Sequence, residues 1–376
     1  MTPLVQSPEF QVVIPAGAER REESAFEPKS RFLAAAPLGM TFPIPRLLRA
    51  AIALALLLWA SPAASAAEIK FASLAPEGTT WMEVMRALDR DMRQATDGAV
   101  RFRIYPGGVS GNEKDVVRKI RVGQLHAAGF TGVGLGEILP AVRLMELPFL
   151  FRDYGEADAV RRALSGWYED AFREKGFVLL GWSEVGFAHF FSQAPIRSRA
   201  DLRRRKVWMW EGDPLAQAYF EALGVRPIPL SVTDVLTSLQ TGLIDTVYVN
   251  PLGAVALQWF TKVKYMSPVP MANVTGAVVV REEAFRRLPA EHRRLLIEKT
   301  REQMEELRRR TRDENGRAVE AMRKRGLRIS EPPSAAELEE FRRIGREAEK
   351  KLAGSLIPAD LLARARKALA EARSPR

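Results

Sequence analysis

Apolar and polar positions along the chain alternate with two periods, one typical of strands and one typical of helices. Between residues 68 and 132, three strand patterns enclose two helix patterns, and Trp81, Met85, Leu88 and Met92 recur at helical spacing in the first helix. In order, the five segments are EIKFASL (68–74), TTWMEVMRALDRDMRQATDG (79–98), VRFRIYP (100–106), GNEKDVVRKIRVGQL (111–125) and HAAGFTG (126–132). This alternation predicts βαβ units and a mainly parallel sheet.

The same alternation starts again after residue 175 and predicts a second α/β unit. Its strands are GFVLLGWSEV (176–185), FAHFFSQ (187–193), RKVWMW (205–210), RPIPL (226–230) and DTVYVN (245–250), and its helices are DPLAQAYFEALG (213–224) and SVTDVLTSLQTG (231–242). After residue 285 the pattern becomes almost wholly helical, with Pro289 at a helix start. The apolar stripe that follows is typical of core packing and consists of Leu295, Leu296, Met304, Leu307, Ala318 and Met322.

The sequence contains no motif that indicates catalysis. The glycine-rich segment GVGLGE (132–137) lacks full dinucleotide-binding spacing, and we predict a turn there. No phosphate-binding loop, serine-hydrolase elbow or zinc-protease motif occurs, and no pair of carboxylates stands out as general acid and base. We therefore expect neither an enzyme nor a cofactor, and a secreted enzyme remains the less favoured alternative.

Composition and charge exclude further classes of protein. The net charge is +11 over 376 residues, but Lys and Arg are dispersed among Asp and Glu, as in EKTREQMEELRRRTRDENGR, so we expect no nucleic-acid partner. The absence of cysteine excludes disulfides, cysteine nucleophiles and Cys/His zinc sites. His126, His189 and His292 are not at metal-ligand spacing, so we expect no metal site.

The N-terminal region predicts export. Arg46 and Arg49 begin a segment whose apolar run covers 50–60, and Ala64-Ser65-Ala66 is typical of a signal-peptide cleavage site. The run is shorter than the ~20 residues that a membrane span needs, although a retained anchor is the alternative. We predict that translation starts at Met40, that 40–66 is a cleaved signal peptide and that 1–39 is a mis-assigned start.

Several phrases together resemble the extracytoplasmic solute-binding proteins of tripartite ATP-independent periplasmic (TRAP) transporters, the DctP-like family. They are YPGGVSGNEKDVVRKIRVGQLHAAG (105–129), ELPFLFRDY (146–154), PIRSRADLRRRKV (195–207), ALGVRPIPLSVTDVLTSLQTGLID (222–245) and NPLGAV (250–255). The resemblance implies an α/β, two-lobed periplasmic solute-binding protein of type II-like fold, with hinge strands and a long C-terminal helix. It also implies a small-molecule ligand in the cleft between the lobes and delivery to the membrane permease subunits.

On this resemblance we assign the lobes to parts of the chain. Lobe I takes 67–189, with about 278–325 supplying its remainder and the long helix. Lobe II takes 190–277, and 326–376 forms a C-terminal helical extension.

Two positions depart from the family pattern, and both concern the ligand. The resemblance implies a carboxylate-binding arginine in the phrase that is KVWMW here, where Trp208 takes its place. A second cation is common in the phrase that is VGFAHFF here, where Ala188 stands. A buried ion without a partner costs several kcal/mol, whereas a buried aromatic side chain contributes roughly 4–6 kcal/mol. We therefore predict an aromatic-lined cleft for an uncharged or hydrophobic, even lipid-like, ligand.

Trp210 shares the face of Trp208, because side chains alternate along an extended segment. Asn250 matches a family position that commonly hydrogen-bonds ligand, and other aromatic residues lie on segments that line the cleft in the family. The predicted ligand-binding residues are Trp208, Trp210, Asn250, Ala188, Phe130, Phe187, Tyr248 and Trp182.

Structural roles and another ligand class remain open at this point. Trp210 has a core or hinge role, and Asn250 a capping role, as alternatives. Glu211 and Asp213 are predicted to cap the helix at Pro214, and the cationic run 203–206 to be a solvated turn. The alternative ligand is an organic acid whose carboxylate is held by another cation, such as Arg143 or Arg152.

Overall fold

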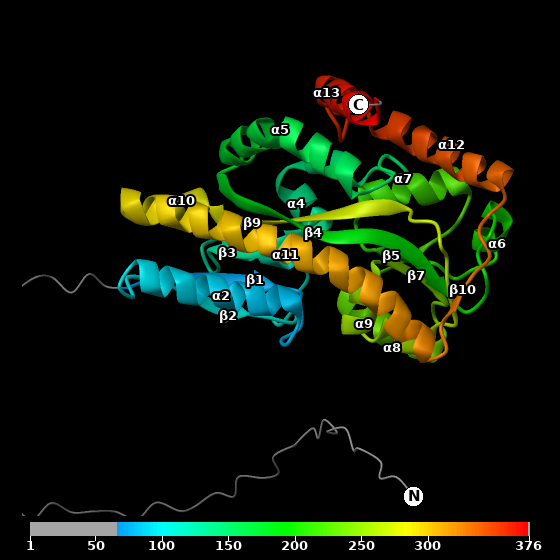
Figure 1. Cartoon of the computed structure of the whole chain (residues 1–376), viewed down its shortest axis with the longest axis horizontal. Coiled ribbons are helices and arrows are strands. Elements are labelled where there is room, and N and C mark those ends of the chain that lie inside the picture. The colour runs from blue at the N-terminus through cyan, green and yellow to red at the C-terminus, as the bar shows by residue number, and fades with distance from the viewer. Residues whose placement is uncertain (1–65, 375–376) are drawn as a thin grey trace, which may run out of the picture. The chain divides into compact units, whose positions relative to one another are not determined.

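The computed structural model describes residues 66–374 (Figure 1). The predicted start at Met40 and nearly all of the predicted signal peptide lie outside these residues. None of the described helices combines the length and the apolar character that crossing a membrane requires.

The strands form one eight-stranded sheet and a separate two-stranded sheet. They are β1 (Ala67–Ser73), β2 (Val100–Tyr105), β3 (Ala127–Thr131), β4 (Phe177–Ser192), β5 (Trp208–Trp210), β6 (Ile228–Leu230), β7 (Thr246–Val249), β8 (Tyr265–Met266), β9 (Ala272–Arg281) and β10 (Arg328–Ile329). The large sheet has the order β10-β8-β4-β9-β3-β1-β2, with β7 also paired to β4, and β5 pairs with β6.

The sheet is mixed, so the prediction of a mainly parallel sheet is wrong. β1 pairs in parallel with β2 and β3, but β9 is antiparallel to both β3 and β4. Two strands predicted from 176–185 and 187–193 are in fact the single 16-residue strand β4. Gly186 does not end the strand because its φ of +108° lies within a bulge, a conformation that glycine adopts without strain.

The helices cover both faces of this sheet. They are α2 (Thr80–Ala95), α3 (Glu113–Arg121), α4 (Gly132–Ile138), α5 (Tyr154–Glu174), α6 (Arg199–Arg203), α7 (Pro214–Leu223), α8 (Val235–Thr241), α9 (Pro251–Ala256), α10 (Glu282–Arg286), α11 (Ala290–Lys324), α12 (Ala335–Leu352) and α13 (Ala359–Arg373), with the 3-10 helices η1 (Pro140–Glu146), η2 (Val232–Asp234) and η3 (Trp259–Lys262).

The 35-residue helix α11 crosses the molecule from α2 to α9, packing on β4 between them (Figure 1). Its predicted apolar stripe is buried at Leu296, Met304, Leu307, Ala318 and Met322. Because β4 pairs with β9 along its first part and with β7 and β8 at its end, β4 and α11 together join the two halves of the sheet.

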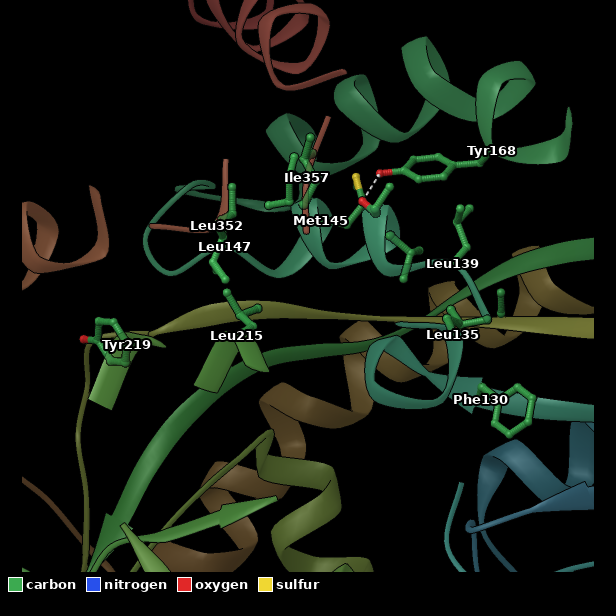
Figure 2. Close-up of a cluster of buried hydrophobic side chains, with 14 of the residues drawn as sticks. Phe130, Leu135, Leu139, Met145, Leu147, Tyr168, Leu215, Tyr219, Leu352 and Ile357 are labelled. Atoms are coloured by element: carbon green, nitrogen blue, oxygen red, sulfur yellow. Dashed lines mark hydrogen bonds between the residues drawn. The ribbon is translucent and has the colours of Figure 1, made fainter. Parts of the chain in front are cut away.

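The C-terminal helices are packed against the rest of the protein. α12 lies against α7 and α13 lies against α5. Figure 2 shows Leu352 and Ile357 of the C-terminal region beside Met145 and Leu147, in a buried layer where the Tyr168 hydroxyl donates to the Ala141 carbonyl at 3.2 Å. The extension therefore completes a core that α5 and α7 would otherwise expose.

Candidate functional site

A cavity of about 230 Å³ opens where the two halves of the sheet meet. Its walls come from β1, α2, α3, β3, α4, η1, β4, β5, η2, β7, α9, η3, β9 and α11. One part of the wall is aromatic and another part carries ionisable side chains, and the two parts adjoin at Tyr248 and Asp213.

Trp208 is the centre of the aromatic wall. Its ring is stacked on that of Tyr248 at 4.9 Å and meets Trp259 edge-on at 5.2 Å. The ring of Trp210 lies 6.1 Å away on the same side of β5, as the alternation of an extended strand requires. The indole Nε1–H of Trp208 donates to the Leu230 carbonyl at 3.1 Å, which fixes the ring against β6. Trp208 is therefore both a core residue and a cavity wall.

The charged wall is built around Arg143 of η1. Its guanidinium donates to the Glu146 carboxylate and, at 2.7 Å, to Oδ2 of Asp213. All three side chains are buried, with 4–6% of each exposed. The Arg143 Nε–H has no hydrogen-bond partner among residues 66–374. A buried donor without a partner is costly, so Arg143 keeps one unused donor beside its two ion pairs.

Asp213 has two roles at once. Its Oδ1 accepts from the backbone N–H groups of Leu215 and Ala216, which confirms the predicted cap of the helix at Pro214. Its Oδ2 binds Arg143, 70 residues away along the chain. Asp213 therefore caps α7 and also carries one of the carboxylates of the cavity wall. Glu211 is exposed and does not cap the helix.

Glu146 is a buried carboxylate whose pKa is shifted toward neutrality. Burial raises the pKa of Glu146 to about 7, because the attraction of Arg143 and the hydrogen bond from the Thr275 N–H only partly offset desolvation and the repulsion from Asp213. Burial lowers the pKa of Arg143, but the charges of Asp213 and Glu146 raise it by more. The arginine therefore stays charged while the state of Glu146 depends on pH.

Glu113, the first residue of α3, supplies a third buried carboxylate. Burial raises its pKa, while the N–H groups of Thr131 and Gly134 and the Thr131 hydroxyl each donate to it at 2.7 Å and oppose that rise. Glu184 of β4 also lines the cavity and is paired with Arg312, so the lining contains four carboxylates and one guanidinium. Among the described residues that line the cavity, Arg143 alone carries a positive charge.

The glycine-rich segment at 132–137 is helical, so the predicted turn is wrong. In α4 each of three glycines lies against one charged side chain of the wall. A Cβ on Gly132 would overlap the Glu146 carboxylate, a Cβ on Gly134 would lie 2.8 Å from Oε2 of Glu113, and one on Gly136 would lie 2.9 Å from Cδ of Arg143. Glycine is thus needed because of what packs against the helix.

Asn250 links the cavity to the long helix. It occupies the cap position of α9, but its side chain makes no capping hydrogen bond and instead donates to Oδ1 of Asn315 at 2.9 Å. Asn315 also donates to the Val185 carbonyl at the β4 bulge, at 3.1 Å. The Asn250 Oδ1 atom has no partner within the described part of the chain. The capping hydrogen bond proposed for the Asn250 side chain is therefore absent, and Oδ1 is left as an unused acceptor near Gly253.

The model of the family described as bacterial extracellular solute-binding protein, family 7, matches residues 71–354. The chain belongs to this family. Its members are binding receptors of TRAP transporters and not enzymes: they bind small molecules outside the cytoplasm and work with a membrane permease. The resemblance inferred from the sequence is therefore confirmed.

Relatives and solved structures of this family agree in fold. The chain is 25% identical over 244 residues to the 2,3-diketo-L-gulonate-binding periplasmic protein of Escherichia coli K12, covering 63% of this chain and 73% of the relative. A Bordetella pertussis receptor that binds pyroglutamic acid superposes with a TM-score of 0.75 at 19% identity, covering 81% of this chain and all of that one. A Ralstonia eutropha H16 protein with bound (S)-2-acetolactate gives 0.76 at 22% identity, covering 81% and 99%. The two-lobed α/β solute-binding fold is confirmed.

The structure brings five of the eight predicted ligand-binding residues of this solute-binding protein to the cavity. They are Trp208, Trp210, Asn250, Phe130 and Tyr248. The other three are packed elsewhere along β4: Trp182 against Tyr168, Phe187 against Tyr154, and Ala188 beside Ala272. The cavity gives no support to a ligand contact by these three, because the bulges of β4 change which face each residue occupies.

The cation of the cavity is one that the sequence suggested only for the alternative ligand, an organic acid. Arg143 lines the cavity, whereas the side chain of Arg152 is 68% exposed and lies beside Glu156. Glu113 and Glu146 were missed, and so was Trp81 of α2, which also lines the cavity. The glycines at every second position of 132–136 were the available signal, since they indicate close approach by other groups.

Proposed function

We propose that this protein captures a small organic acid in the cavity and delivers it to a TRAP permease. The observation that carries the proposal is Arg143: it lines the cavity, is buried and has an Nε–H without a partner among the described residues. A guanidinium can hold a carboxylate through its Nε–H and one Nη–H in a two-pronged geometry. Arg143 would thus replace the arginine that the family pattern has where this chain has Trp208.

The remaining wall suits an acid with an apolar or flat body. Trp208, Trp210 and Tyr248 offer aromatic surface, and the free Oδ1 of Asn250 can accept from a ligand hydroxyl or amide. The relatives support the acid class, because diketogulonate, pyroglutamic acid and acetolactate are all carboxylic acids.

A second candidate is the uncharged or hydrophobic ligand that the sequence predicts. It is favoured by the aromatic wall and by the two carboxylates that already occupy Arg143. Native mass spectrometry of the purified protein tests it directly. A retained lipid or other neutral molecule would support this candidate, and a retained small acid would exclude it.

Calorimetry with matched ligand pairs tests the proposed function. Each acid named for the relatives is titrated beside its neutral methyl ester, and we expect the acid to bind at least about tenfold more tightly, since a charge-assisted pair contributes about 1.5–3 kcal/mol. Arg143→Lys keeps the charge but loses the planar fork, so we expect a ten- to hundredfold loss of acid affinity.

Two further variants separate the candidates. Arg152→Ala removes an exposed arginine away from the cavity and is expected to leave affinity unchanged. Esters that bind as tightly as acids, or acids that bind Arg143→Lys as tightly as the original protein, would contradict the proposal. Tight acid binding that survives Trp208→Ala would exclude the hydrophobic-ligand candidate.

We also propose the lobe boundaries and the route to the permease. Residues 67–189 with about 278–325 form one lobe and 190–277 the other, so the Arg143–Asp213 pair joins the lobes across the cleft. Export through a cleaved signal peptide over 40–66 places the protein in the periplasm. The ligand shifts the lobes toward the closed form only by its differential affinity for that form.

A further inference from the structure

The cavity already contains more negative than positive charge before any acid enters. Glu113, Glu146 and Asp213 face it together with one arginine, and all four side chains are buried. A further buried carboxylate of the lining, Glu184, is neutralised by its pair with Arg312 of α11. A ligand carboxylate would add one more negative group to the same cavity. Charges held together at low dielectric repel strongly, so the site needs a way to discard one.

The three carboxylates differ in how firmly their charge is held. Glu113 receives three hydrogen bonds from Thr131 and Gly134, and Asp213 receives two backbone hydrogen bonds and one from Arg143. Glu146 receives a single backbone hydrogen bond, from Thr275, besides its pair with Arg143. When a ligand shares Arg143, Glu146 is thus the carboxylate with the fewest other hydrogen bonds to hold its charge.

We propose that the ligand anion binds together with one proton. Glu146 takes up this proton as the ligand carboxylate takes over Arg143. This inference rests on the proposed function. The step balances: the ionised Glu146, the ligand anion and one solvent proton give a neutral Glu146 and an arginine–ligand pair. Glu146 would thereby limit which ligands the site accepts. A ligand with a second negative charge beside Glu146 would find no proton to neutralise that charge.

The groups around Glu146 act on its charged form in opposite directions. Arg143 of η1 attracts its charged form, and Asp213 of α7 and Glu113 of α3 repel that form. The β9 neighbour is the uncharged Thr275 N–H, and α4 presents Gly132. Tyr248 of β7 faces Arg143 and Asp213, and burial raises the pKa of Tyr248 so that it stays neutral.

Calorimetry in two buffers measures the proton directly. Pyroglutamate and the other acids of the panel are titrated at about pH 8 in phosphate and in Tris, whose ionisation enthalpies differ, and the difference in heat gives protons taken up per ligand. Because the pKa of Glu146 is about 7 before binding, we expect uptake approaching one proton at pH 8 and little at pH 5.5. Affinity should fall by up to tenfold per pH unit above pH 7.

Glu146→Gln provides the specific variant, since glutamine keeps an acceptor for Thr275. It should bind acid with no proton uptake and with an affinity that does not change between pH 6 and 8, whereas the exposed Glu211→Gln should behave like the original protein. Should Glu146→Gln fail to fold, the buffer comparison on the original protein still decides.

The outcomes separate this inference from the proposed function. Heat without proton uptake at pH 8, or full uptake by Glu146→Gln, overturns the inference alone. No heat from any acid at either pH overturns the proposed function and this inference with it.

Discussion

At the scale of single residues, the site depends on close contacts that glycine permits. The three glycines of α4 each leave room for one charged side chain of the wall, and none of the three has a positive φ. Their value is therefore steric rather than conformational. A residue with no side chain here determines where Arg143, Glu113 and Glu146 can lie.

Gly132→Ala tests this steric role. The new Cβ would overlap the Glu146 carboxylate, so we expect a loss of about 1–3 kcal/mol in the free energy of unfolding, as for an overpacked core, and weaker acid binding. Urea denaturation and calorimetry measure the two effects.

Gly316→Ala is the matched control, because Gly316 lies in α11 with no atom within 4 Å of the added Cβ. Alanine is the better helix former, so the free energy of unfolding of this variant should rise by about 0.5–1 kcal/mol. Equal stability of the two variants would refute the steric explanation.

At the scale of elements, an ion cluster fastens α11 to α5 and β4 beside the bulge. Arg312 of α11 donates two hydrogen bonds to Asp158 at 2.8 and 2.9 Å and two to Glu184 at 2.8 Å. Its guanidinium also lies over the Tyr154 ring, at 4.4 Å from the centroid. These contacts hold the long helix where β4 passes from one half of the sheet to the other.

Asp158 should make this fastening sensitive to acid. Burial alone would raise the pKa of Asp158, but hydrogen bonds from Arg312 and Arg161 lower it to about 2. Because the folded pKa is below the unfolded value, the stabilisation is present above about pH 4 and is lost as the pH falls through 2. We expect about 2 kcal/mol less unfolding free energy over that window.

Urea denaturation at pH 2 to 5 tests this prediction. The unfolding free energy of Asp158→Asn should not show this loss as the pH falls. Asp313→Asn removes an exposed carboxylate of α11 and should show it. An unchanged pH profile in Asp158→Asn would show that the cluster does not stabilise the native state through this carboxylate.

At the scale of the whole molecule, the C-terminal helices connect parts that lie far apart in the sequence. Phe341 of α12 stacks on Phe149 at 6.3 Å, and Arg373 of α13 donates to Glu156 of α5 at 2.7 and 2.8 Å. Gly345 lies against the Pro148 carbonyl, so the helix approaches the backbone closely. The extension therefore covers the segment that leads out of η1, the helix that carries Arg143.

Truncation after residue 331 tests this role. It removes α12 and α13 and exposes apolar surface of α5 and α7, so we expect unfolding at clearly lower urea concentration and binding of a hydrophobic dye. Truncation after residue 373 removes only the last three residues and serves as the control. Equal midpoints for the two chains would show that the extension adds nothing to the core.

Sequence periodicity predicted most elements correctly, because strands and helices bury one face at a fixed repeat. It placed the strands of the first unit, the helix at Pro214 with its Asp213 cap, and the buried stripe of α11. It failed at β4 and α4, where glycine indicated a break and tertiary contacts instead continued the strand and the helix.

The sequence by itself determined the family and most of the helices and strands, since each of these is carried by residues close together in the chain. Only the tertiary structure decided that Arg143, Glu146, Glu113 and Asp213 share one buried cavity wall with Trp208. The most distant of these charged residues, Glu113 and Asp213, are too far apart in the sequence for a local pattern to link them. Their charges interact only because the fold removes water from between them, and that removal is what shifts the pKa of Glu146 to about 7.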